Sequence, residues 1–431
     1  MNSQSIFKNL PIIEQIFEAK DAISGPELIN TYCENGNHIL FSSLDGNIVL
    51  YNCKRKCRDF SSKIELTNKS LTPILSMTYN SKEKAIVFID ACNYIHYDNP
   101  EHLNHHCIKD NIEEIESITY LIDNKYFIKT TSNINYIYEI NKEEDKQNHL
   151  LNIKPIMKYT FPVKPTAIFK TDTHIYLGTQ RAIYRINLKT FHTQTPKVIY
   201  ELNIQNNKNI SDKNEGIITS MFYYDPKNSC YKDSNIVNSN NAIKYILNNN
   251  SFRKSEDIDI IEDEESESDE ENVDELLILG NNLGKIEVIP MDNLEKKYSF
   301  KCFIKNDYYS PVTAIAYDNL RQNIYIGSYD GHLYGLNISN KKKIFCYKKF
   351  IGGIYGIVYI PKLDVLVYSV TNYEDEIFCE ENYEEIKENK NKRKNYEIFD
   401  ENNDGRNEKI KENKIYMVND IDGFIKLINK K

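Results

Sequence analysis

One short pattern occurs seven times along this chain of 431 residues, and it restricts the possible folds more than any other feature. A turn residue follows an alternating apolar run, an aliphatic residue stands two positions later, and Asn usually stands six positions later. The turn residues are Gly46, Asn93, Asn135, Arg181, Gly284, Gly331 and Gly423. In the clearest copies the turn is Asp-Gly, the strongest short-range signal of a tight hairpin, because such turns need φ > 0. We therefore predict a hairpin at each copy, with Gly331 and Gly423 at positive φ.

The spacing of these turns predicts the architecture. Successive turns are 47, 42, 46, 103, 47 and 92 residues apart, so four intervals are single repeats and two are about double. A period in the forties built from β-strands is typical of propeller blades, each a four-stranded sheet. A further alternating run precedes the hairpins, for example at 74–79 and 312–317, and is predicted to be the innermost strand. The sequence thus predicts an all-β fold, a single seven-bladed β-propeller of four-stranded blades over residues 1–431.

The repeated phrase resembles the end of a WD40 repeat, in which an Asp-Gly hairpin leads into a strand that closes with Trp-Asp. The likeness covers nearly the whole chain, but its motifs are degenerate, because the chain has no Trp and no repeat starts with Gly-His. The family's Asp–His–Ser–Trp hydrogen-bond network is therefore expected to be absent. Asn usually replaces the closing Asp, and because an amide both donates and accepts, it can still fix the turn after the strand. These residues are Asn52, Asn99, Asn141, Asn187, Asn337 and Asn429.

The resemblance also implies how the ring closes. In WD40-like propellers the N-terminal strand completes the last blade, so that no sheet edge stays open. The last repeat ends soon after its third strand, so residues 7–17, with Ile12, Ile13 and Ile16, are expected to supply the fourth. The same stretch would also suit a short helix.

An acidic segment interrupts the fifth repeat. Residues 256–275 hold thirteen carboxylates and no Lys or Arg, in a chain of 54 basic and 63 acidic side chains with a net charge of −9. Because so few apolar residues cannot repay the entropy of ordering, we expect residues 226–273 to be a disordered insertion in blade 5. It is either a solvated low-complexity loop or a docking element for a basic partner. Ser266 and Ser268 are candidate phosphoacceptors, since each has an acid three residues later.

A second insertion, rich in Lys, Asn and Glu and also expected to be disordered, spans residues 371–413 in blade 7. Its basic cluster at 390–394 fits a solvated linker better than a nuclear-import signal. Two runs here compete for one strand position: residues 365–370 follow the inner strand, and residues 415–418 directly precede Asp422-Gly423. One run is surplus to a four-stranded blade, and the sequence does not decide which.

Several residue groups resemble metal sites, and each departs from the motif. Asp400, Asn402, Asp404 and Gly405 match the first half of an EF-hand loop, but Lys411 stands where a bidentate Glu is required. A thiol pair and a His/Cys cluster one repeat later lie on different predicted blades and lack the paired spacing of zinc sites. They are Cys53 and Cys57, and His102, His105, His106 and Cys107. No metal or cofactor is predicted.

Catalytic signatures are missing as well. There is no phosphate loop, no nucleophile elbow and no His-Glu-x-x-His. The isolated residues His96, His174, His192 and His332 fit surface or satisfied core positions better than catalytic ones. An enzyme with scattered loop residues is kept as the third reading. The near-neutral body lacks a basic stripe, so direct nucleic-acid binding is not expected.

Composition points to the cytoplasm, the nucleus or both. No apolar stretch is long enough for a membrane span, the N-terminal residues lack the features of a signal peptide, and nine scattered Cys do not suggest a disulfide framework. We predict a non-enzymatic scaffold that docks proteins or peptides in an intracellular assembly. The alternative is a nuclear factor in chromatin or ribosome assembly whose acidic insertion engages basic partners. The candidate docking residues lie in the turns: Asp45, Asn93, Asn135, Arg181, Asn282, Tyr329, Asp330 and Asp422.

Overall fold

The computed structural model describes most of the residues that lie outside the two predicted insertions. The described residues are 13–18, 29–31, 38–42, 47–63, 74–80, 82–99, 104–109, 114–144, 149–180, 182–201, 217–224, 275–302, 304–305, 308–348, 352–371 and 413–429. Disorder is predicted for residues 226–273 and 371–413. All of these residues except Thr371 and Asn413 lie outside the described set. So do Ser266, Ser268, Asp45, Arg181, His102 and the EF-hand-like group from Asp400 to Lys411.

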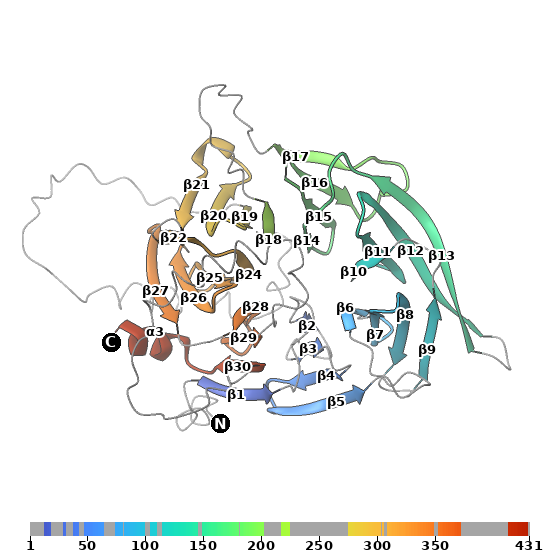
Figure 1. The fold of residues 1–431 in the computed structure, drawn as a ribbon, viewed down its shortest axis with the longest axis horizontal. Helices are drawn as coiled ribbons and strands as arrows, with labels where there is room; N and C mark the ends of the chain where they lie inside the picture. Colours follow the sequence, from blue (N-terminus) through green and yellow to red (C-terminus); the bar gives the residue numbers. More distant parts are fainter. Residues whose placement is uncertain are drawn as a thin grey trace, which may run out of the picture.

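The described residues form seven four-stranded antiparallel sheets arranged in a ring, as the blades of a propeller (Figure 1). Blade 1 holds β2 (Ile29–Thr31), β3 (His38–Ser42), β4 (Asn47–Asn52) and β5 (Cys57–Lys63). Blade 2 holds β6 (Ile74–Asn80), β7 (Ala85–Asp90), β8 (Tyr94–Asn99) and β9 (Asn104–Lys109). Blade 3 holds β10 (Ile115–Tyr120), β11 (Lys125–Thr130), β12 (Ile134–Glu144) and β13 (His149–Thr160). Blade 4 holds β14 (Ala167–Lys170), β15 (His174–Gly178), β16 (Ala182–Asn187) and β17 (Lys197–Glu201).

The remaining blades follow the same order from centre to rim, except that the last takes its outer strand from the N-terminal region. Blade 5 holds β18 (Ile218–Tyr224), β19 (Leu276–Asn281), β20 (Lys285–Pro290) and β21 (Tyr298–Lys301). Blade 6 holds β24 (Val312–Asp318), β25 (Asn323–Ser328), β26 (His332–Asn337) and β27 (Lys342–Lys348). Blade 7 holds β28 (Gly353–Ile360), β29 (Val365–Thr371), β30 (Lys414–Val418) and β1 (Ile13–Glu18). The other described elements are β22 (Ile304–Lys305), β23 (Tyr308–Tyr309), the 3₁₀ helix η4 (Leu294–Lys296) and helix α3 (Ile421–Asn429).

The N-terminal strand closes the ring, as predicted. β1 runs antiparallel to β30, with Glu14 opposite Met417. The Glu14 carboxylate also accepts a hydrogen bond from Lys56 of blade 1 at 2.5 Å and one from Asn419 at 3.3 Å. Residues 13–17 therefore form a strand and not a helix, and this strand joins blade 7 to blade 1.

The seventh hairpin prediction is wrong. Asp422-Gly423 lies in the first turn of helix α3, where Asp420 Oδ1 accepts a hydrogen bond from Gly423 N at 2.8 Å. The physical reason is a helical spacing of apolar residues at Ile421, Phe424, Ile425 and Ile428, which buries one face of the segment. Both competing runs are consequently strands, β29 and β30, and neither is surplus.

Three of the other described turn residues take the left-handed conformation of a tight hairpin, whereas Asn135 lies inside β12, so for that residue the turn prediction is wrong. Gly284 has a φ of 69° and Gly331 one of 83°, and Asn93 takes the same left-handed region with a φ of 66°. Gly423 is not among the residues with positive φ, because helical residues have negative φ.

The core lies between neighbouring blades. At the seam of blades 3 and 4, for example, Phe127 and Ile137 of one blade pack against Ile175 and Leu177 of the next, all at 0% exposure. Alternate residues of each strand point to opposite seams, which is why the sequence alternates and yet both faces of each blade are buried.

Three of the predicted amides fix the turn that follows their strand. The side-chain oxygens of Asn52, Asn187 and Asn337 accept hydrogen bonds from backbone N–H groups two or three residues later, at 2.8–3.0 Å. For Asn429 the prediction is wrong, because this residue ends α3 and does not close a third strand.

Candidate functional site

The candidate docking residues must first be placed on the two faces of the disc. Because each blade is an antiparallel meander, the turn between its second and third strands lies on the face opposite to its other two turns. Face A denotes the face with the second-to-third turns, which include Asn93, Gly284 and Gly331. Face B denotes the opposite face, with the first-to-second turns, which include Arg321 and Asp364.

On face A, the side chains of three candidate residues point inward. Asn93 Oδ1 accepts a hydrogen bond from Ile115 N at 2.9 Å, and Asn282 Oδ1 accepts one from Ile217 N at 2.7 Å. Asn135 lies inside β12 at 0% exposure, where its amide donates to Asn133 O at 3.4 Å. The side-chain oxygens of Asn93 and Asn282 are thus used within the fold, and Asn135 is buried in its strand.

Asp330 is also held within the fold. Its carboxylate accepts hydrogen bonds from Ser310 Oγ at 2.9 Å and Ser328 Oγ at 2.5 Å, and lies 2.9 Å from His332 Nδ1. Burial alone would raise the pKa of Asp330, but the contacts with His332, Ser328 and Ser310 outweigh burial and lower this pKa to about 2. The WD40 network of Asp, His, Ser and Trp is not formed here, because the chain has no Trp, but blade 6 has a related group of one Asp, two Ser and one His.

Among the described candidate residues, Tyr329 projects from face A. Its side chain is 42% exposed and meets Tyr355 of β28 edge to face, with ring centroids 6.2 Å apart and an interplanar angle of 80°. A Cβ added to Gly353 would lie 2.6 Å from Tyr329 O, so Gly353 allows β28 to approach the turn this closely. The result is an aromatic corner at the seam of blades 6 and 7.

A β-bulge repeats near the face A end of the innermost strands, and the sequence analysis missed it. In five blades the register shifts at the second or third residue of the inner strand. The bulged residues are Leu75, Glu116, Thr219, Thr313 and Tyr355. Each stands between a β-branched aliphatic residue and a small residue, as in Ile74-Leu75-Ser76, and this pattern was the available signal.

The bulged residues divide the inner rim of face A into two arcs. Thr219 Oγ1 donates to Val312 O of the next blade at 2.5 Å, and Thr313 Oγ1 donates to Ile354 O in the same way. These two hydroxyls join blades 5, 6 and 7. Leu75 is instead 39% exposed, and Glu116 is 37% exposed at its side chain. The arc that includes blades 2 and 3 therefore presents side chains to the surroundings.

Glu116 is held between two lysines. Its Oε1 lies 2.8 Å from Lys129 Nζ and its Oε2 lies 2.7 Å from Lys164 Nζ. Lys129 is buried, with 7% of its side chain exposed, whereas 40% of the Lys164 side chain is exposed. The group carries a net positive charge at the rim of face A, next to the exposed Leu75 of the neighbouring blade.

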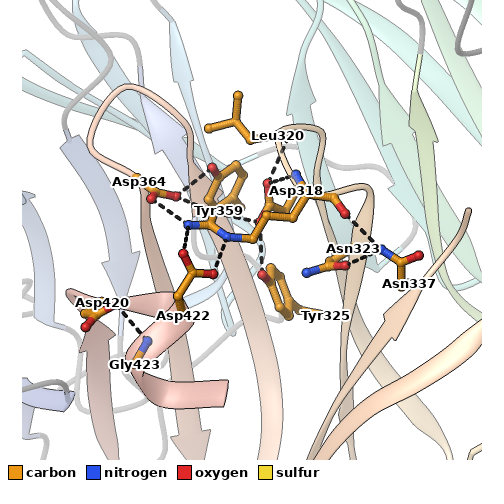
Figure 2. Close-up of polar contacts among 11 residues, drawn as sticks. Asp318, Leu320, Asn323, Tyr325, Asn337, Tyr359, Asp364, Asp420, Asp422 and Gly423 are labelled. Carbon is orange, nitrogen blue, oxygen red and sulfur yellow. Dashed lines mark hydrogen bonds and ion pairs between the residues drawn. The ribbon is translucent and has the colours of Figure 1, made fainter. Parts of the chain in front are cut away.

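Asp422, the remaining candidate, does not lie with the others. It belongs to α3 and contacts Arg321 in the first-to-second turn of blade 6, so it lies toward face B (Figure 2). Arg321 Nη1 also lies 3.1 Å from Asp318 Oδ2 and 2.7 Å from Asp364 Oδ1. The guanidinium thus joins blade 6, blade 7 and the helix, and the prediction that Asp422 forms a face A turn is wrong.

Burial and the guanidinium act on these carboxylates in opposite directions. Burial raises the pKa of Asp318, which has no exposed side-chain surface, and Arg321 opposes this rise only in part. For Asp364, burial again raises the pKa, but the hydrogen bonds from Arg321 outweigh it, so that the net pKa is lowered. Tyr325 donates to Asp318 and Tyr359 donates to Asp364, both at 3.0 Å. With its donors occupied in this way, Arg321 acts as a structural link.

The residues considered for metal binding do not come together where the structure describes them. Cys53 is buried in blade 1, where burial raises the pKa of its thiol to about 12, and Cys57 is exposed at the start of β5. His105, His106 and Cys107 are on β9 of blade 2, with side chains outside the described set. Among the described residues, no group of three or more His, Cys, Asp or Glu side chains is placed to hold a metal ion.

The isolated histidines have structural contacts or lie at the surface. His96 is 3% exposed, stacks on Phe88 at 4.5 Å and places Nε2 3.0 Å from Asp90 Oδ2. His174 contacts Thr173 and Asn187, and His192 is exposed. Within the described part of the chain, no helix has the length and apolar character needed to cross a membrane.

Solved structures share this architecture. The β-propeller domain of Cps50 (Swd1) from Myceliophteria thermophila matches with a TM-score of 0.51 and 10% sequence identity, over 83% of this chain and 96% of that one. The chain has a WD40-like propeller fold. Sqt1 from Saccharomyces cerevisiae gives a TM-score of 0.49 and 12% identity, over 82% of this chain and 80% of that one. At such identities the likeness concerns the fold alone. No family model matches the sequence, and no curated protein matches it.

Proposed function

We propose that the propeller is a non-enzymatic scaffold that docks a segment of a partner protein on face A, within an intracellular assembly. The observation that carries this proposal is a contrast on face A. The turn residues form hydrogen bonds within the fold, whereas residues at the rim are exposed. Asn93, Asn282 and Asp330 use side-chain oxygens within the fold, whereas Tyr329, Leu75 and Lys164 remain accessible. A rigid surface with aromatic, aliphatic and cationic contact groups binds peptides at a low ordering cost.

The proposal is tested with partners co-purified from cells. Tyr329→Glu and Leu75→Glu each place a charge on the docking surface, so both should lose a common set of partners. Leu320→Glu is the matched control, because Leu320 is 39% exposed, as Leu75 is, but lies on face B. Retention of every partner by both face A variants would refute docking on this face.

A second candidate function rests on charge. The acidic residues 256–275 suit a basic partner, as expected for a nuclear factor in chromatin or ribosome assembly. Removal of residues 227–273 should then abolish binding of partners whose association weakens with salt, while the partners lost in Tyr329→Glu are retained. If the deleted protein keeps all its partners at both low and moderate salt, the insertion is not a docking element.

A further inference from the structure

Helix α3 occupies a site on the outer rim, between blades 6 and 7. Phe424 is 1% exposed and meets Phe345 and Tyr347 of β27 edge to face, with ring centroids 5.4 Å apart in both pairs. Asn429 Nδ2 donates to Ile344 O at 3.2 Å. Ile344 is the bulged residue of β27, since the register shifts between Gly335 and Leu336 on the facing strand. The helix thus covers a bulge and the buried aromatic residue that follows it.

Blade 4 has the same arrangement on its outer strand, without a helix among the described residues. The pairing of β16 with β17 shifts register between Ile183 and Tyr184 of β16, so Ile199 of β17 is the bulged residue. Tyr200 follows it at 7% exposure and packs toward blade 5, as Phe345 packs toward blade 7. This part of the rim of blades 4 and 5 is therefore the counterpart of the site that α3 fills (Figure 1).

A groove of about 480 Å³ lies at this position. It is lined by Val198, Ile199, Tyr200 and Glu201 of β17 and by Leu294, Glu295 and Lys297 of blade 5. Val198 is 40% exposed and Leu294 is 41% exposed, so the described residues leave two large apolar side chains of the groove only partly covered. Burying them against a guest would stabilise binding by the hydrophobic effect.

The polar groups of the groove carry charges of both signs. Glu201 and Glu295 line it together with Lys297, whose Nζ donates to Tyr200 Oη at 3.0 Å. This hydrogen bond raises the pKa of Lys297, which keeps the ammonium charged. The groove thus combines apolar and charged side chains, which suits an amphipathic guest.

We propose that the rim groove, defined by Val198, Ile199, Tyr200, Leu294 and Lys297, binds the apolar face of a short amphipathic helix of a partner protein. A helix fits better than an added strand, because the bulge at Ile199 interrupts the regular ladder that strand addition requires. This site is independent of the surface proposed on face A.

The probe is a fluorescent synthetic peptide of residues 419–431, the α3 sequence, with Gly423→Ala to favour the helix. Full-length protein should bind it saturably, and Val198→Glu or Leu294→Glu should weaken binding at least tenfold. Leu75→Glu, equally exposed but on face A, should bind as wild type does, and this separates the rim groove from the face A proposal.

Three results would overturn the proposal. Absence of saturable binding to the wild-type chain is the first. Unchanged binding by Val198→Glu and Leu294→Glu is the second, and it would indicate exchange with α3 in blade 6. Binding that appears only after removal of residues 203–215 is the third, because it would assign the groove to a segment of this same chain. Thermal unfolding midpoints of all variants establish that each is folded.

Discussion

At the scale of single residues, amides take over a position where the WD40 pattern has a carboxylate. In three blades the amide also bonds to the residue opposite it on the second strand: Asn52 to His38, Asn187 to His174 and Asn337 to Asn323. The turn-fixing role was predictable from the sequence, because it needs only an acceptor. The cross-strand contact was not, because it depends on strand register, which the sequence does not state residue by residue.

Asn337→Asp tests this double role. Asn337 Nδ2 donates to Asn323 Oδ1 and Arg321 O, both at 2.9 Å, and a carboxylate would face these oxygens without a proton to donate. We expect a loss of about 1–2 kcal/mol in the free energy of unfolding, measured by urea denaturation. Asn340→Asp, at an exposed position in the same turn, is the control. Equal stability of Asn337→Asp and wild type would contradict the assigned contacts.

Asp330 gives stability a defined pH dependence. Its folded pKa of about 2 lies below the unfolded value of about 3.9, so its contribution is fully present above pH 4 and is lost as the pH falls toward 2. We expect a contribution of about 2 kcal/mol, the size that such a pKa difference implies. Asp330→Asn should therefore lower stability at pH 6 and flatten its decline between pH 4 and pH 2. Parallel curves for variant and wild type would exclude this role.

At the scale of elements, the strands of the blades were predictable from alternating apolar residues and from the turn residues between them. At α3 the same repeat predicted a hairpin where the structure has a helix. Asp422-Gly423 stands at a position that suits a hairpin, and the tandem pattern suggested one. The spacing of Ile421, Phe424, Ile425 and Ile428 was the competing signal, and it prevailed because Phe424 finds an aromatic site on β27. For the face A candidates, the sequence located the turns but not the direction in which their side chains bond.

Arg321→Met should detach α3 from the blades. The substitution leaves the fully buried Asp318 without its cation, and it removes the ion pairs to Asp364 and Asp422. We expect the free energy of unfolding to fall by about 3 kcal/mol, with faster amide exchange in residues 421–429. Asp422→Asn is the comparison, and because Asp422 is 63% exposed it should cost less than about 1 kcal/mol. Unchanged exchange in α3 after Arg321→Met would show that apolar packing alone holds the helix.

At the scale of the whole molecule, stability depends on closure of the ring by β1. Deletion of residues 1–20 removes this strand, exposes the edge of β30 and breaks the contacts of Glu14 with Lys56 and Asn419. We expect a lower unfolding midpoint for the entire protein, followed by circular dichroism, because a seam between two blades is lost and not just a terminus. If the truncated protein unfolds at the wild-type midpoint, β1 is dispensable for closure.

The pairing of Glu14 with Met417 joins positions about 400 residues apart. A ribosome releases residue 14 long before residue 417, so β1 must wait, unpaired, through nearly the whole of synthesis. Contacts between neighbouring blades can form as each is made, but this one has to be the last. We therefore expect the nascent chain to depend on chaperones that shield the open edges of blades 1 and 7, and a ribosome stalled in the second insertion to carry six blades without a ring.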